Sequence, residues 1–318
     1  MNGDAKHFCA GIHVSDVALA ERSHTTMADS IGSTMTEAAK AAEDSAVRVR
    51  LTFWGVRGSI AVPAQDHLRY GGNTPCVEVR VGETVLVIDA GTGARRLGMH
   101  LEDEFAGAQL EINLLLTHFH WDHIQGLPFF TPLYSDENHV IFYSCQTPEK
   151  LKQVLVGEMS NPYFPVNFDY LAAKRDFVDL RSAPLSRADF SVHPFPMHHP
   201  QGATGYRIEA GGIVITHASD LEHGDAALDK TLREHAQNAD VLIYDAQYTP
   251  EEYPQRKGWG HSTWLEATRV ARDCKVKRLV LFHHDPNHDD EWMRQIVHEA
   301  RRHFENTEAA REGLDIIF

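Results

Sequence analysis

The sequence predicts a protein of the α/β (α+β) class, in which two β-sheets pack face to face with helices on the outside. Short β-rich runs separated by glycine-containing turns dominate the first third after residue 50, namely "LTFWGV", "CVEVRV" and "TVLVIDAG". Strand and helix patterns alternate in the last third of the chain. The composition, with 42% hydrophobic and 24% charged residues, is ordinary for a soluble globular protein. These features together favour two layered sheets with outer helices.

The remaining elements are predicted in a fixed order along the chain. Strands are expected at "EINLLLT" (111–117), "SVHPFPMHH" (191–199), "TGYRIEA" (204–210), "GIVITHASD" (212–220), "VLIYDA" (241–246) and "RLVLFHH" (278–284). Helices are expected at "TPEKLKQVLVGEM" (147–159), "DAALDKTLREHA" (225–236), "STWLEATRVARD" (262–273) and "DDEWMRQIVHEARRHFEN" (289–306). Ser262 or Thr263 is the expected N-cap of the third of these helices.

Two segments are predicted to stand apart from this scaffold. Residues 1–48 are polar, rich in Ala, Ser and Thr, and weakly patterned, so we expect a flexible N-terminal extension ahead of one domain over 49–318. Residues 145–190 form a possible lid. Its aromatic residues either stack on a nucleobase or pack the segment onto its own domain; they are Tyr163, Phe164, Phe168 and Tyr170.

Charge and composition narrow the function classes. The formal net charge of −15 argues against a long nucleic acid as partner, whereas a small phosphorylated substrate is compatible with it. No apolar run is long enough to span a membrane, and the N-terminus lacks the pattern of a signal peptide. The four cysteines form no CxxC pair, so a reducing cytoplasm is the expected location. The oligomeric state, including a homodimer, stays open.

The chemistry of the chain is indicated by the stretch "LLLTHFHWDHIQGL" at 114–127. His118 and His120 are two residues apart at the end of a predicted strand, so both project to one side. Asp122 and His123 follow where the chain turns, and aim nearby. A pattern HxHxDH arises by chance on the order of 0.01 times in such a chain, so the match favours two metal ions side by side over coincidence.

Four ligands cannot close two metal sites, so later strand ends must supply the others. The candidates are Asp220 in "THASDLEH", His198 or His199 in "MHHP", and His283 or His284 in "LFHHDP". Each follows a β-rich run, where binding sites are commonly built. An aspartate between two metals can bridge them, which makes Asp220 the expected shared ligand.

Together these motifs resemble the metallo-β-lactamase fold superfamily over roughly residues 51–318. The resemblance implies a four-layer αβ/βα sandwich of two mixed β-sheets, with helices on the outer faces and a dinuclear site at one edge. It implies that one metal is held by His118, His120 and His199 and the other by Asp122, His123 and His283, with Asp220 as the bridge. Asp89 in "VLVIDAGTG" matches the strand-end aspartate that braces such sites.

The segment "YDAQYTPEEYPQRKGWGHSTWLEATRVA" resembles the tRNase Z and related phosphodiesterase branch of this superfamily. In that branch an acidic residue orients a histidine that meets the scissile phosphate, and the matching residues are Asp245 and His261. The branch commonly has Glu where this chain has Asp245. The predicted catalytic residues are therefore His261, Asp245 and Asp122, of which His261 assists the leaving oxygen.

The function expected from these residues is metal-dependent hydrolysis of a small phosphodiester such as a cyclic nucleotide, with a metal-bridged hydroxide as nucleophile. The cofactors would be two divalent ions, zinc first, with manganese or iron as alternatives. The same centre could instead hydrolyse an ester, thioester or lactam. Two further alternatives are tRNA 3′ processing and a diiron redox or sensor protein, although such diiron relatives generally place Glu where this chain has His120.

Overall fold

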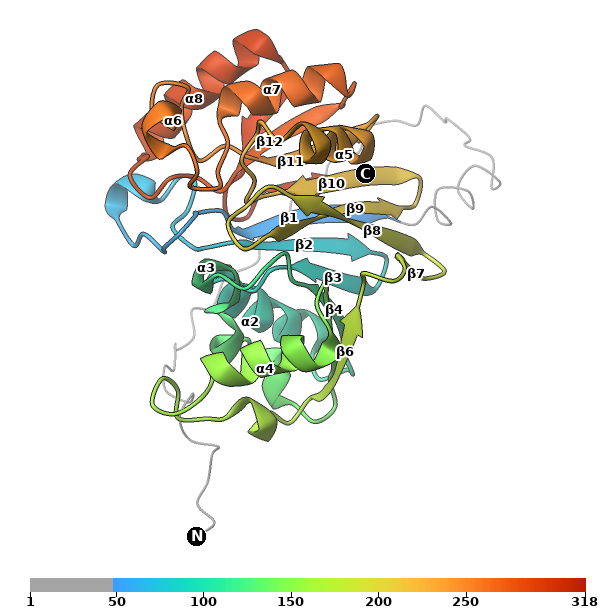
Figure 1. Ribbon diagram of the computed structural model, residues 1–318. Coiled ribbons are helices and arrows are strands. Elements are labelled where there is room, and N and C mark those ends of the chain that lie inside the picture. Colours follow the sequence, from blue (N-terminus) through green and yellow to red (C-terminus); the bar gives the residue numbers. More distant parts are fainter. Residues whose placement is uncertain (1–47) are drawn as a thin grey trace, which may run out of the picture. The chain divides into compact units, whose positions relative to one another are not determined.

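The computed structural model describes residues 48–318, and in this range two seven-stranded mixed sheets are stacked with helices on their outer faces (Figure 1). Residues 1–47, where the N-terminal extension is predicted, lie outside the described residues. The first sheet has the order β14-β1-β2-β3-β4-β5-β6. Its strands are β1 Val49–Gly55, β2 Cys76–Val81, β3 Thr84–Ile88, β4 Glu111–Leu115, β5 His139–Ser144, β6 Lys174–Asp179 and β14 Asp315–Ile317.

The second sheet mirrors the first, with the order β13-β12-β11-β10-β9-β8-β7. In each sheet four strands run in parallel and the others pair antiparallel, so both sheets are mixed as predicted. The strands of the second sheet are β7 Leu185–Ser186, β8 Phe190–Met197, β9 Ala203–Ala210, β10 Ile213–Ala218, β11 Val241–Asp245, β12 Arg278–Phe282 and β13 Thr307–Ala309.

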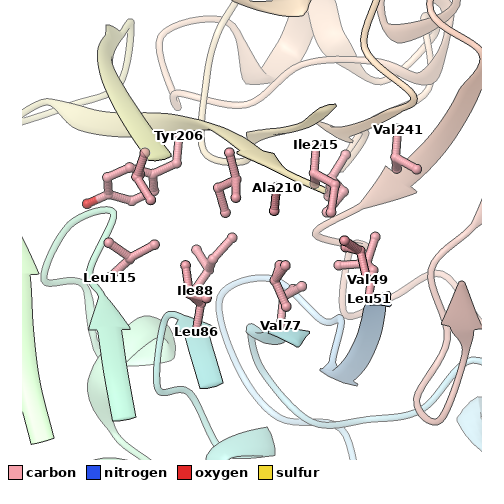
Figure 2. Packing of buried hydrophobic residues seen from close by; sticks show 14 of the residues in the cluster. Val49, Leu51, Val77, Leu86, Ile88, Leu115, Tyr206, Ala210, Ile215 and Val241 are labelled. Atoms are coloured by element: carbon pink, nitrogen blue, oxygen red, sulfur yellow. The ribbon is translucent and has the colours of Figure 1, made fainter. Parts of the chain in front are cut away.

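The space between the sheets is filled by the side chains that alternate inward along each strand. Figure 2 shows Leu115 and Ile88 of the first sheet facing Tyr206 of the second, and Val77 facing Ala210. These side chains are fully or almost fully buried. At about 25 cal/mol per Å² of apolar surface removed from water, this layer is the main stabilising contact between the two halves.

Helices connect the parallel strands and cover the outer face of each sheet. The helices on each face pack over one hydrophobic cluster. Thr263 Oγ1 accepts a hydrogen bond from Glu266 N (3.1 Å), so Thr263 rather than Ser262 caps α7. The helices are α2 Gly93–Phe105, α3 Trp121–Ile124, α4 Pro148–Glu158, α5 Ala226–Ala236, α6 Tyr253–Arg256, α7 Trp264–Asp273 and α8 Asp290–His303, with 3₁₀ turns at Gln65–His67, Leu127–Phe129, Thr131–Tyr134 and Phe168–Tyr170. Within residues 48–318, none of the helices has the length and apolar character needed to cross a membrane.

The segment 145–190, predicted as a possible lid, carries α4 and strand β6 on the edge of the first sheet. Phe168 is buried against Phe142 of β5, with ring centroids 5.9 Å apart. Tyr163 and Tyr170 are instead 81% and 82% exposed. Part of the aromatic set therefore packs the segment onto its own domain, and closure over a site stays a prediction.

Candidate dinuclear metal centre

The predicted ligands come together because they all follow the ends of strands that meet at one edge of the sandwich. Parallel strands present their carboxyl ends on the same side, and short loops hold the side chains there. The loop after β4 and the short helix α3 supply four of them. The later loops supply the rest, and the complete set is His118, His120, Asp122, His123, His199, Asp220 and His283.

The first cluster contains three imidazoles, those of His118, His120 and His199. Nε2 of His199 lies 3.2 Å from Nδ1 of His120. The other ring nitrogen of His199, Nδ1, donates to the carbonyl oxygen of Gly260 (2.8 Å), which leaves Nε2 as the acceptor that faces the cluster. Burial lowers the pKa of both His118 and His199, and this favours the neutral imidazole that binds metal.

The second cluster contains Asp122, His123, Asp220 and His283, all buried. Nε2 of His123 lies 3.2 Å from Asp220 Oδ2, and Nε2 of His283 lies 3.2 Å from both Asp122 Oδ2 and Asp220 Oδ1. Asp220 Oδ1 is also 4.0 Å from Nε2 of His118 in the first cluster. The carboxylate of Asp220 therefore stands between the two clusters, in the position of a shared ligand.

The donor set fits two divalent cations. Among residues 48–318, Nε2 of His118 and Nε2 of His123 are buried nitrogen atoms without a hydrogen-bond partner, and the candidate ligand atoms of each cluster lie within 4.8 Å of one another. A buried polar atom without a partner costs free energy, and a bound cation would remove this cost. Imidazoles with carboxylates suit zinc, manganese or iron. When such ions are bound, these seven residues would hold them.

Charge compensation in the second cluster follows from the same contacts. Burial alone would raise the pKa of Asp122 and of Asp220, but the imidazoles of His123 and His283 outweigh it and hold both pKa values below the usual range. Burial alone would lower the pKa of His283. The carboxylates of Asp220 and Asp122 outweigh burial and raise this pKa to about 9. In the absence of metal ions, protons therefore bind to groups of this cluster. Metal binding would release these protons.

Further hydrogen bonds orient the ligands from behind. Asp89 accepts from Nδ1 of His123 (2.7 Å), from Thr117 N (2.8 Å) and from Thr117 Oγ1 (2.8 Å). Gln247 Oε1 accepts from Nδ1 of His283 (2.9 Å), and Ser59 N donates to Asp122 Oδ2 (2.8 Å). Such bonds fix ring tautomers and raise ligand basicity. Asp89 therefore has the bracing geometry that the sequence predicts.

Asp245 and His261 form a separate hydrogen-bonded pair beside the second cluster. Nδ1 of His261 donates to Asp245 Oδ2 at 2.8 Å, so the shorter aspartate reaches the ring. The carboxylate of Asp245 also accepts from the backbone N–H groups of Asp220 (3.0 Å), Gln247 (3.1 Å) and Ser262 (3.1 Å). Four donors occupy its lone pairs, which favours an orienting role for Asp245 over metal ligation.

The backbone is strained at two of the candidate ligands and at the aspartate that braces His123. Asp89, Asp220 and His283 have φ values of +60°, +65° and +60°, in the left-handed region that favours glycine. Such conformations persist where the surrounding structure imposes them, and they cluster at functional sites. Here they turn each side chain back toward the centre directly after a strand ends.

The structure separates the rival histidines that the sequence leaves open. His198 is exposed, and His284 Nε2 instead lies 2.8 Å from the carbonyl oxygen of Ala310, away from the clusters. Sequence reasoning missed Glu222, whose carboxylate accepts from the N–H groups of Gly258 (2.8 Å) and Gly260 (3.0 Å). Glu222 thereby fixes the loop that carries His261, and no local pattern marks this residue.

A cavity of about 420 Å³ opens onto the centre. Its walls include His120, Asp122, Asp220 and His261, so the metal ligands and the histidine of the Asp245 pair face one space. The indole of Trp121 stands at the rim and is 79% exposed. The arrangement can hold an electrophile against two cations while His261 contacts the same molecule.

The family model described as "Beta-lactamase superfamily domain" matches residues 84–284, more than half of the chain. Ribonuclease Z of Archaeoglobus fulgidus is 26% identical, with 85% of this chain and 98% of that protein covered. Ribonuclease Z of Thermoplasma acidophilum is 24% identical, with 85% and 96% covered.

Solved structures show the same fold. The metallo-β-lactamase fold protein YhfI from Bacillus subtilis has a TM-score of 0.64 at 19% identity, covering 86% of this chain and all of that chain. A diphosphatase from the PhnP family has a TM-score of 0.61 at 21% identity, covering 85% and 97%. With its matched family and its set of imidazole and carboxylate donors, the chain belongs to the β-lactamase superfamily, in its ribonuclease Z-like branch, and is a metal-dependent hydrolase.

Proposed function

We propose that this hydrolase is a phosphodiesterase that acts on a small phosphodiester such as a cyclic nucleotide. The observation that supports this most directly is the His261–Asp245 pair, with Nδ1 and Oδ2 at 2.8 Å, in a cavity that His261 shares with the metal ligands. Hydrolysis of a phosphodiester expels a poor leaving group that needs a proton. A histidine beside the ligands, with its ring 4.8 Å from that of His283, can supply one.

In the proposed reaction the residues of this chain bind, orient and transfer a proton. Two divalent cations, when bound, lower the pKa of coordinated water and neutralise charge on the phosphoryl oxygens. Asp122, Asp220 and the imidazoles would hold those cations. Asp245 keeps the proton of His261 on Nδ1, so a proton on Nε2 is the one that can pass to the leaving oxygen.

Acyl hydrolysis is the main alternative chemistry at the same centre. An ester, thioester or lactam can be attacked by the same activated water, but the thiolate or phenolate that leaves a thioester or an activated ester is stable as an anion and has less need of a positioned acid. The four hydrogen bonds that anchor Asp245 behind His261 therefore favour the phosphodiester. An acyl hydrolase would tolerate loss of His261.

Processing of tRNA is the second candidate, and one observation favours it. Relatives named ribonuclease Z are 24% and 26% identical over 85% of this chain. The net charge of −15 counts against a long polyanion, because its binding requires phosphate neutralisation by clustered Lys and Arg. We therefore place the small phosphodiester first, with zinc as the first metal and manganese or iron as alternatives.

The test combines metal analysis with a substrate panel. Purified protein reconstituted with zinc, manganese or iron is assayed on bis-p-nitrophenyl phosphate, cyclic nucleotides, a precursor tRNA, a thioester and nitrocefin. We expect phosphodiester turnover to exceed acyl turnover. Acyl hydrolysis without phosphodiester turnover on any metal would overturn the proposal, and cleavage of the precursor tRNA alone would favour the second candidate.

The role of His261 is tested by three variants. His261→Ala is expected to retain its metal and to lose roughly 10²- to 10⁴-fold in turnover, the usual contribution of a general acid. His118→Ala is expected to lose metal instead. His298→Ala, at an exposed position on α8, is the matched control and should change neither. Loss of metal in His261→Ala would make this residue a ligand.

A further inference from the structure

A second cavity, of about 500 Å³, adjoins the metal cavity. The two cavities share two wall residues, Phe119 and His120, so they lie directly beside each other. The walls of the second cavity come from both sheets. The segments after β4, β5 and β6 line one side, and the end of β8 with the start of β9 line the other.

The chemistry of its walls suits an uncharged ring system. Phe119, Leu180 and Pro196 offer apolar surface, while Gln146 and Gln201 place exposed amide groups at the border. Apart from its histidines, Arg181 is the only charged residue that the described part of the chain contributes to the lining. The guanidinium of Arg181 is already paired with Asp179, with Nη2 and Oδ2 at 2.6 Å. A second phosphate would find no unpaired cation there, whereas a nucleobase would find apolar faces and amide partners.

The wall is also fixed relative to the metal ligands. Gly202 N donates to the carbonyl oxygen of His199 (2.8 Å), and Thr204 N donates to that of Thr117 (3.0 Å). The segment that carries Gln201 is therefore hydrogen-bonded to two ligand-bearing segments. A group held in the second cavity would keep a set distance from the centre, which is what positioning for in-line attack requires.

We infer that the second cavity binds the nucleoside of a nucleoside phosphodiester while the phosphate occupies the metal cavity. This inference rests on the proposed phosphodiesterase activity and names its substrate class. The volume of the second cavity lies within the range of about 300–1,000 Å³ typical of small-molecule sites. The nucleoside then sets specificity, while His261 lines the cavity that holds the phosphate.

The test uses two substrates with the same leaving group. The p-nitrophenyl ester of thymidine 5′-monophosphate carries a nucleoside, and methyl p-nitrophenyl phosphate carries only a methyl group. The unmodified protein is expected to show at least a tenfold higher kcat/KM for the nucleotide ester. Gln146→Trp, which fills the exposed border of the cavity, should remove this preference and leave turnover of the methyl ester unchanged.

Two further variants keep the result interpretable. Gln153→Trp makes the same change at an exposed position on α4 outside both cavities, and should leave the preference intact. Gln146→Ala removes the amide without adding bulk and should lower the preference about fivefold, the equivalent of one hydrogen bond. Equal effects of Gln146→Trp on both substrates, or no preference in the unmodified protein, would overturn the nucleoside site.

Binding separates this inference from the proposed activity. Adenosine and thymidine are titrated into metal-free protein, and we expect at least one to bind the unmodified protein and Gln153→Trp but not Gln146→Trp. Binding with this pattern alongside no phosphodiester turnover would remove the proposed function and retain the nucleoside site. Turnover of both esters without binding or preference would retain the function and remove the site.

Discussion

The carboxylate of Asp89 accepts a hydrogen bond from Nδ1 of His123 at 2.7 Å, and both side chains are fully buried. Asp89 directly follows β3 and His123 lies in α3, so this bond ties the end of a strand of the first sheet to a helix behind the centre. It leaves Nε2 of His123 as the atom that faces Asp220. The fold and the metal centre are therefore coupled through one imidazole ring.

Replacing Asp89 should weaken metal binding more than folding. The Asp89 carboxylate accepts three hydrogen bonds. In Asp89→Asn the amide group can keep only one of the two oxygens, so its N–H group faces a donor such as Nδ1 of His123. His123 then loses its fixed orientation. We expect a loss of about 10- to 100-fold in metal affinity, as for other groups that orient ligands. Competition with a chromophoric chelator measures it. Asp136→Asn, in an exposed turn, is the control, and equal affinities for the two variants would contradict the bracing role.

Two glycines near His261 provide a matched pair. Gly258 and Gly260 both have φ +88°, but a Cβ on Gly260 would lie 2.5 Å from Nδ1 of His199, whereas a Cβ on Gly258 meets nothing within 4 Å. Alanine at either position costs about 1 kcal/mol of backbone strain. Only Gly260→Ala is expected to displace His199, with at least a tenfold loss of kcat/KM. Similar kinetics for both variants would show that the close approach does not matter.

Glu158, at the end of α4, should make stability depend on pH. Burial raises the pKa of its carboxyl group from 4.5 to about 8, and its Oε2 is buried without a hydrogen-bond partner. Between these values the unfolded chain releases a proton that the folded chain keeps, so stability falls as pH rises toward 8. Glu158→Gln removes this loss and should raise Tm by a few degrees at pH 8, corresponding to about 1–3 kcal/mol.

The same gain should nearly vanish at pH 5, where the carboxyl group of Glu158 is protonated in the folded protein. Thermal unfolding at constant metal load measures both values. Glu137→Gln, in an exposed turn, serves as the comparison. A gain for Glu158→Gln that does not change between pH 5 and pH 8 would be inconsistent with a buried, protonated carboxyl.

Tyr206 should link the core between the sheets to the ligand loop. Its hydroxyl donates to the carbonyl oxygen of Leu116 at 2.6 Å, directly before Thr117 and His118 (Figure 2 shows the Tyr206 ring). Tyr206→Phe leaves that carbonyl buried and unsatisfied, at a cost of about 1–3 kcal/mol in the free energy of unfolding. Urea denaturation of Tyr206→Phe and of Tyr163→Phe, which is 81% exposed, tests this; equal midpoints would refute it.

Much of the site can be predicted from the sequence because the candidate ligands follow strand ends in short, recognisable motifs. His118 and His120 are two residues apart, so their common direction follows from strand geometry alone. The choice between His198 and His199 depends on the turn into β9, which the sequence does not specify. The contact between Gln247 and His283 joins residues that are 36 positions apart. Such contacts require the parallel pairing of β11 with β12, which no local pattern contains.

The fold was predicted in outline, and its missed elements have physical reasons. The two sheets with outer helices are confirmed, but several elements were not predicted, among them the helix α2 and the strands β5, β6, β13 and β14. Glycine lowers helix propensity, yet Gly98 in α2 is required because a Cβ there would lie 2.9 Å from Pro132. The run "HVIFYS" of β5 is short, and its four central residues are hydrophobic without alternation, so the pattern does not distinguish a buried strand from part of a helix.

The left-handed backbone at Asp89, Asp220 and His283 has an evolutionary consequence. Glycine at any of these positions would relax the main chain by up to about 1 kcal/mol while deleting a ligand or its brace. Without selection for turnover, the local backbone at these positions would favour glycine, although the hydrogen bonds and ion pairs of the three side chains would be lost with the substitution. A carboxylate or an imidazole at all three positions is therefore explained by the site and not by the local backbone.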